Sequence, residues 1–157
     1  MSILIDTGIF YAFYNKRDVH HLDSICILVH AMEGKWGRIY TTNLIVAETA
    51  TLLRYRISLK ATMGFLEALN GSNVKIIFMD EFLYDETIKT LVKHPDKRLS
   101  FADAFSITTI SKLGINYLAT YDERSFKGLV NNIIGNEYSK ILPKEEIDRI
   151  LKEINYK

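Results

Sequence analysis

Residues 3–8 carry the pattern of a short buried strand that ends at an acid, Ile3-Leu4-Ile5-Asp6-Thr7-Gly8. A continuous apolar run with β-branched residues, bounded by turn formers, is typical of such a strand. The Asp-Thr-Gly segment predicts a turn directly after it. The first strand therefore brings a carboxylate to its end, and the rest of the fold can be placed relative to that point.

The remaining pattern alternates strands with helices. Runs rich in β-branched and aromatic residues predict further strands at 39–41, 74–79 and 115–119. Apolar residues at helical spacing predict helices over 20–32, 43–57 with Asn43 as N-cap, 60–69, 81–92, 101–113 with Ser100 as N-cap, and 143–154. This alternation implies crossover connections and a parallel sheet. The predicted fold class is α/β, a three-layer α/β/α sandwich around a short central parallel sheet, with one domain over residues 1–157.

Composition and charge exclude several classes of protein. A chain of 157 residues with 48% hydrophobic and 25% charged residues fits one folded globule. The net charge of +1 argues against an architectural DNA-binding protein, so nucleic acid must be held locally. The single cysteine, Cys26, excludes an internal disulfide. Apolar runs are too short to span a bilayer and no signal peptide is visible, so we expect a soluble, cytoplasmic protein without a membrane partner.

Four acids stand out because of their places in the predicted elements. Asp6 and Asp122 follow predicted strands, and the carboxyl ends of parallel strands form the edge where ligands bind. Asp103 lies in the first turn of a largely apolar helix, where a carboxylate is costly unless positive charge or hydrogen bonds meet it. Glu48 lies early in another helix with many apolar neighbours. The sequence therefore predicts an acidic site at one edge of the sheet.

Each acid also has an ordinary structural interpretation. Asp6 can form an Asx turn, Asp103 can complete a capping box with Ser100, and Asp122 can open a surface turn. Glu48 can be a solvated helix residue. Only the occurrence of all four acids together favours a shared site over these separate roles.

Other site chemistries fit the sequence less well. The triplet Asp6-Thr7-Gly8 occurs in aspartic proteases, but those are all-β proteins and this chain is rich in helix signals. In the haloacid dehalogenase-like phosphatases a second aspartate stands at the position that Gly8 occupies here. None of the four histidines has zinc-ligand spacing with another histidine or with the cysteine.

The ordered set of segments resembles the PIN-domain nucleases and, within them, the small toxins of the VapC type. The matching segments are 3–8, 43–48, 100–104 and 118–122, followed by Phe126. The resemblance implies a PIN-like fold and a metal-dependent endoribonuclease in which four acids surround one or two Mg²⁺ or Mn²⁺ ions: Asp6, Glu48, Asp103 and Asp122. It covers residues 3–126, whereas residues 136–157 carry no matching motif.

The chemistry of the residues agrees with that implied reaction. Hard divalent cations prefer carboxylate oxygens and water, and a bound cation relieves the repulsion between converging carboxylates. In that reaction Asp6 and Asp103 would chiefly hold the ion, and the ion would help a water molecule lose a proton and attack phosphorus in line with the leaving ribose oxygen. Three hydroxyl residues are expected to orient the carboxylates: Thr7, Ser100 and Thr120.

RNA also requires local positive charge near the acids. The candidate RNA contacts follow Glu48 and Asp122 in the chain: Arg54, Arg56, Arg124 and Lys127. The alternative for these side chains is a solvated charged surface.

Two protein partners are expected. The helices near residues 22–32 and 44–69 contain more large apolar side chains than one core needs, which implies a second surface, and the resemblance predicts that this surface pairs two copies into a homodimer. The resemblance adds an antitoxin protein whose tail covers the acidic site. The alternative function is a PIN-fold protein that binds RNA without cleaving it, or a housekeeping RNA-processing nuclease.

Overall fold

The computed structural model describes residues 1–157 and is built around one five-stranded sheet. All strands are parallel, in the order β3-β2-β1-β4-β5, so the first strand lies at the centre. The strands are β1 (Ser2–Ile5), β2 (Arg38–Thr42), β3 (Lys75–Ile77), β4 (Tyr117–Thr120) and β5 (Ile133–Gly135). The helices are α1 (Thr7–Tyr14), α2 (His21–Met32), α3 (Asn43–Arg56), α4 (Leu59–Asn70), α5 (Glu81–Lys93), α6 (Phe101–Leu113), α7 (Glu123–Phe126), the 3₁₀ helix η1 (Tyr138–Ile141) and α8 (Lys144–Glu153).

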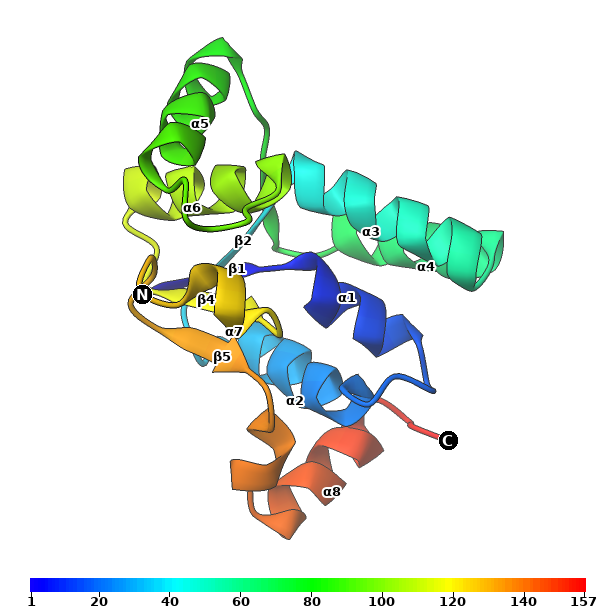
Figure 1. The fold of residues 1–157 in the computed structure, drawn as a ribbon. Helices are drawn as coiled ribbons and strands as arrows, with labels where there is room; N and C mark the ends of the chain where they lie inside the picture. Colours follow the sequence, from blue (N-terminus) through cyan, green and yellow to red (C-terminus); the bar gives the residue numbers. More distant parts are fainter.

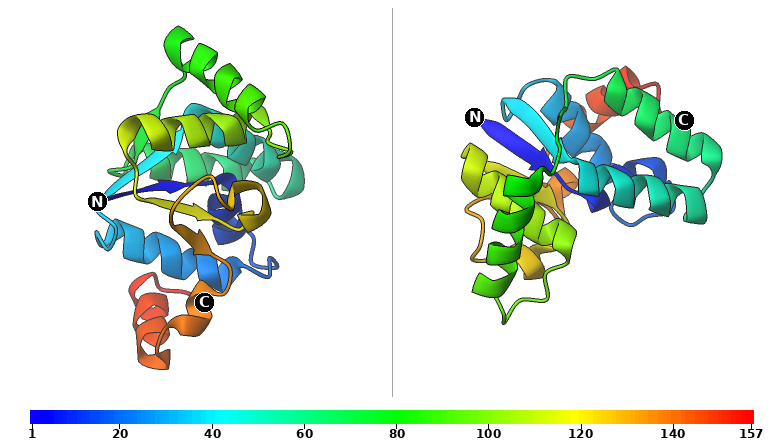
Figure 2. Two further views of the ribbon diagram at one scale, coloured as in Figure 1. Left: turned by 60° about the vertical axis from the view of Figure 1, so that its left-hand side comes forward. Right: turned by 90° about the horizontal axis from the view of Figure 1, so that it is seen from above.

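Helices cover both faces of the sheet (Figure 1). Helix α2 lies on one face with α8 outside it, and α6 lies on the other face with α5 outside it. The left-hand view of Figure 2 shows the same three layers. Helices α3 and α4 form a hairpin that extends beyond the sheet (Figure 1). The predicted α/β/α sandwich around a parallel sheet is therefore confirmed.

The centre of the sheet is its most buried part, because helices cover both sides of β1. The side chains of Ile3, Leu4 and Ile5 are fully buried, as expected for a central strand of a parallel sheet. The ring of Phe10 packs on Phe65 with centroids 5.2 Å apart, which joins α1 to α4. This packing fixes the direction in which α1 leaves the end of β1.

The predicted turn after the first strand is wrong, because α1 begins directly at Thr7. Asp6 is the N-cap of this helix, and its carboxylate accepts a hydrogen bond from the backbone N–H of Thr7. Ile9 and Ala12 are buried in the core. Tertiary packing therefore stabilises a helix where the Asp-Thr-Gly segment alone predicts a turn.

Two strands also differ from the sequence-based prediction. The strand expected over 74–79 is only Lys75–Ile77, since it lies at an edge and pairs with β2 alone. The opposite edge strand, β5, was not predicted at all. Its Gly135 passes so close to β4 that a Cβ atom there would lie 1.9 Å from the carbonyl oxygen of Thr120.

The longer helices agree with the prediction to within one residue at each end. Gly114 ends α6 in the left-handed conformation, with φ of 64°. The expected N-cap of α3 is wrong by one residue. The cap is Thr42, whereas the side chain of Asn43 accepts a hydrogen bond from the backbone N–H of Met79. No helix combines the length and apolar character needed to cross a bilayer.

Candidate active site

A cavity of about 820 Å³ lies at the edge of the sheet where the carboxyl ends of β1 and β4 meet α1, α3 and α6. All four predicted acids line this acidic cavity: Asp6, Glu48, Asp103 and Asp122. The three predicted hydroxyl residues line it as well: Thr7, Ser100 and Thr120. Gly8, Tyr11, Leu52 and Tyr121 complete its wall. The structure thus brings together residues from four separate parts of the chain.

Helix starts place three of the acids in the cavity. Asp6 caps α1, Asp122 caps α7, and Asp103 forms a capping box with Ser100 at the start of α6. In that box the Ser100 hydroxyl accepts from the Asp103 N–H at 3.0 Å, and the Ser100 N–H donates to the carboxylate at 3.1 Å. The ordinary capping role and a place in the acidic cavity therefore coexist in the same residues. Glu48 instead reaches the cavity from the body of α3.

Thr120 connects two of these acids. Its hydroxyl donates a hydrogen bond to Oδ2 of Asp6 at 2.7 Å and accepts one from the backbone N–H of Asp122 at 3.1 Å. The side chain is buried, so water does not compete strongly for these bonds. The orientation of the Asp6 carboxylate is therefore set by the protein itself.

The carboxylates influence one another electrostatically. The pKa of Asp6 is raised to about 6, chiefly by burial and also by the charges of Asp103 and Glu48, against the hydrogen bonds from Thr120 and Thr7. Burial also raises the pKa of Glu48, and the charge of Asp103 adds to the increase. The pKa of Asp103 is raised by burial and by the charge of Asp122. The charges of Glu48, Asp103 and Asp122 thus act on neighbouring carboxylates in the same cavity.

The donor set fits a hard divalent cation such as Mg²⁺ or Mn²⁺. The cavity offers carboxylate and hydroxyl oxygens, and neither histidine nor cysteine lines it. The hydroxyl oxygen of Thr7 is buried without a hydrogen-bond partner, although it is close enough to oppose the rise in the pKa of Glu48. No three Asp, Glu, His or Cys side chains converge as a ready-made cage. Such a set suits an ion that keeps several waters and takes few protein ligands.

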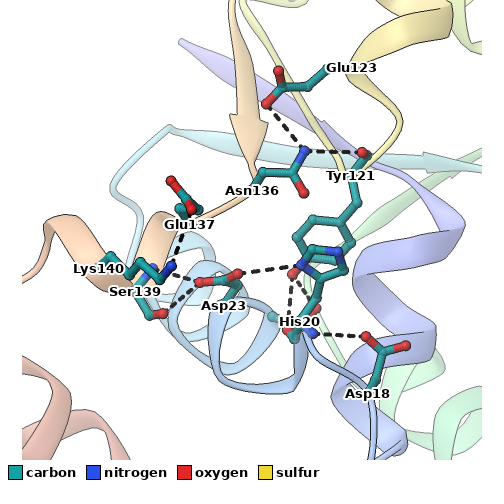
Figure 3. A network of polar contacts seen from close by, with 10 residues as sticks. Asp18, His20, Asp23, Tyr121, Glu123, Asn136, Glu137, Ser139 and Lys140 are labelled. Atoms are coloured by element: carbon teal, nitrogen blue, oxygen red, sulfur yellow. Dashed lines mark hydrogen bonds and ion pairs between the residues drawn. The ribbon is translucent and has the colours of Figure 1, made fainter.

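Tyr121 is a cavity residue that the sequence analysis missed, and Figure 3 shows how it is held. Its ring stacks on the imidazole of His20 with centroids 4.0 Å apart. Its hydroxyl lies 2.6 Å from the Ser24 hydroxyl, and its carbonyl oxygen accepts from Asn136 at 3.2 Å. These contacts fix the corner between β4 and α7, which carries Thr120 and Asp122. Its position between those two residues was the only sequence signal for this role.

The predicted basic residues lie outside the cavity wall. Arg54, Arg56, Arg124 and Lys127 are all exposed. Arg56 alone among them contacts a cavity residue through its side chain, with its guanidinium 5.9 Å from the centroid of the Tyr11 ring. Lys97, which the sequence analysis did not select, donates hydrogen bonds to the backbone oxygens of Arg124 and Lys127 at 3.2 and 3.0 Å.

Comparison with known proteins supports the same family throughout. The sequence model of the PIN domain matches residues 3–130. A VapC ribonuclease of Archaeoglobus fulgidus is 41% identical over 152 residues, which cover 96% of this chain and 93% of the relative. The 23S rRNA-specific endonuclease VapC20 of Mycobacterium tuberculosis is 26% identical over 120 residues, covering 76% and 88%.

The fold is also found among solved structures. The crystal structure of Mycobacterium tuberculosis VapC20, described as a toxin that cleaves the sarcin-ricin loop, superposes with a TM-score of 0.70 at 25% identity. The match covers 82% of this chain and 96% of that one. The superposition leaves a larger share of this chain than of VapC20 uncovered. Residues 131–157 of this chain lie beyond the segment that matches the PIN domain.

Proposed function

The chain belongs to the PIN domain family, and from this premise we propose that it is a divalent-metal-dependent endoribonuclease, the toxin of a toxin–antitoxin pair. The observation that carries the proposal is the acidic cavity, which brings four carboxylates together and in which burial and neighbouring carboxylates raise the pKa values of Asp6, Glu48 and Asp103. The relative with 41% identity is named a ribonuclease, which supports RNA as the substrate. All four acids are present, so nothing in the site favours a PIN-fold protein that only binds RNA.

In the proposed site Asp6 and Asp103 would hold Mg²⁺ or Mn²⁺, and Glu48 and Asp122 would complete the shell directly or through water. A bound divalent cation lowers the pKa of water and offsets the charge of a phosphate. Thr120 holds the Asp6 carboxylate in one orientation, and Ser100 does the same for Asp103. Hydrolysis then forms a bond from the water oxygen to phosphorus, breaks the bond to the leaving ribose oxygen, and returns a proton to that oxygen.

The test is cleavage of synthetic RNA by the purified protein with Mn²⁺ or Mg²⁺. We expect cleavage to stop in excess chelator and in Asp103→Asn, because the amide preserves the shape of the side chain but removes its charge. Asp85→Asn is the matched control, since Asp85 is exposed on α5 and is not part of the cavity wall. Full cleavage by Asp103→Asn, or in excess chelator, would contradict the proposal.

The homodimer belongs to the same proposal, and we place its surface on α5 rather than on the helices near residues 22–32 and 44–69. Two of the large apolar side chains in the segment 44–69, Phe65 and Leu69 of α4, are buried in the core of the chain itself. Helix α5 instead exposes an apolar stripe of Tyr84, Ile88 and Val92. We propose that this stripe is the surface through which two copies associate.

A second apolar surface suits the antitoxin. A groove of about 500 Å³ lies between α1, α2 and α4 and is lined mainly by hydrophobic side chains. Helix α1 is shared, since Phe10, Phe13 and Tyr14 line this groove while Tyr11 lines the acidic cavity. An apolar segment of an antitoxin bound in the groove would therefore contact the helix that also contributes Tyr11 to the acidic cavity.

A further inference from the structure

The wall of the acidic cavity continues beyond the carboxylates along two neighbouring helices. Helices α1 and α3 follow the adjacent strands β1 and β2, lie in contact and extend away from the sheet (Figure 1). Tyr11 of α1 and Leu52 of α3 line the cavity, and both are half-buried. The cavity thus has an acidic part at the sheet and an apolar part between these helices.

Along this apolar part, the side chains on one face of α3 change from acidic to apolar to basic. Glu48, Leu52 and Arg56 are spaced by four residues, so they lie on the same side of the helix. At 1.5 Å per residue, Glu48 and Arg56 are about 12 Å apart along the helix axis. This separation favours contact of Arg56 with a phosphate further along the chain of a bound nucleic acid than the one beside the carboxylates.

Tyr11 stands between these two ends. Its hydroxyl accepts a hydrogen bond from Asn15 Nδ2 at 3.3 Å, and the Arg56 guanidinium lies 5.9 Å from its ring centroid. These contacts hold an aromatic ring at the cavity wall and hold a guanidinium beside it. Aromatic rings next to cationic groups are how proteins bind the bases and backbone of unpaired nucleic acid.

We propose that Tyr11 and Arg56 form a nucleotide subsite, in which Tyr11 stacks on one base and Arg56 contacts a phosphate that is not cleaved. The inference rests on the proposed function, since it assigns residues to the substrate of the same site. The ligand class is a single-stranded nucleotide segment, because a base can reach the ring only when it is unstacked.

The test measures binding of a fluorescent single-stranded RNA to chains that also carry Asp103→Asn, so that no cleavage occurs. In this background Tyr11→Leu should weaken binding about tenfold, as loss of one stacked base predicts, whereas Tyr11→Phe should bind within about twofold of the parent. Arg56→Gln should lower the slope of log affinity against log salt by about 0.7, and Tyr11→Leu should leave that slope unchanged. Tyr55→Leu is the matched control, since Tyr55 is 84% exposed and does not line the cavity.

A scan of abasic positions in the RNA separates stacking from structural damage. One abasic position should weaken binding to the parent but cause no further loss in Tyr11→Leu. Equal binding of parent and Tyr11→Leu, or the same loss at every abasic position in both chains, would overturn the inference. Failure of the proposed function gives a different result. In that case the parent protein cleaves no RNA with Mn²⁺ or Mg²⁺, but Tyr11→Leu still weakens RNA binding.

Discussion

The hydroxyl of Thr120 donates a 2.7 Å hydrogen bond to Oδ2 of Asp6, across 114 positions of the chain. The bond joins the carboxyl ends of β1 and β4, which are neighbours in the sheet. Because the same hydroxyl accepts from the N–H of Asp122, it sets the geometry of two acids at once. The acidic cavity is therefore organised by the sheet itself.

Removing this hydroxyl should impair the site without unfolding the protein. In Thr120→Val we expect RNA cleavage to fall about 10- to 100-fold, the usual range for a partner that orients a metal ligand. Thr120→Ser retains the hydroxyl and should stay within a few-fold of the parent. The measurement is the cleavage rate at saturating Mn²⁺, with melting temperatures as the control for folding. A fully active Thr120→Val would show that the bond has no part in the reaction.

The raised pKa of Asp6 predicts that the metal-free protein loses stability as the pH rises. The pKa is about 6 in the folded state against 3.8 for the unperturbed group, so between these values the folded state binds more protons than the unfolded state. The contribution of Asp6 to the free energy of unfolding should therefore decrease between about pH 4 and about pH 6. At pH 7 Asp6→Asn should be more stable than the parent, by an amount on the order of 1–2 kcal/mol. Urea unfolding of both chains at pH 5 and pH 7 in EDTA measures the difference, and an equal pH dependence in the two would contradict this assignment.

Divalent ions should stabilise the folded state by mass action. At a hundredfold excess over the dissociation constant, Mn²⁺ should add about 2.7 kcal/mol and raise the melting temperature. The response should be weaker at pH 5.5 than at pH 7.5, because protons compete for the same carboxylates. We expect Asp103→Asn to lose the response and Asp85→Asn to keep it. A melting temperature that neither Mn²⁺ nor Mg²⁺ changes would argue against metal binding by these carboxylates.

Expression in cells that lack an antitoxin for this protein tests the toxin part of the proposal. The parent should arrest growth, whereas Asp6→Asn should not, since it cannot hold the ion that cleavage requires. Immunoblots must show equal amounts of both proteins. If the two cultures grow equally, the toxin assignment is wrong, although the chain can still be a nuclease.

The α5 stripe predicts the oligomeric state. Sedimentation at micromolar concentration should give twice the chain mass of 18.1 kDa. Val92→Lys should give the monomer, because it places a charge on the most exposed residue of the apolar stripe. Val19→Lys is the control, since Val19 is 89% exposed in the segment between α1 and α2. A parent protein that sediments as a monomer would exclude the dimer.

Much of the fold follows from local patterns. The helices of ten residues or more were predicted to within one residue because apolar side chains recur at helical spacing and Ser100 and Gly114 mark helix ends. The places of Asp6 and Asp122 after strands predicted which edge of the sheet would be acidic, since parallel strands share their carboxyl end. These features depend on residues that are near one another in the chain.

The features that only the tertiary structure reveals depend on residues that are far apart in the chain. Helix α1 forms at an Asp-Thr-Gly segment because packing of Phe10 on Phe65 favours a helix over a turn. Strand β5 exists because the sheet offers β4 as a pairing edge, which no local pattern reveals. The apolar wall of the acidic cavity, with Tyr11 beside Arg56, appears only where α1 meets α3. Sequence determined the helices and the acids because their signals are local. Contacts between distant segments determined the strand order and the surroundings of each acid, because such contacts form only in the folded chain.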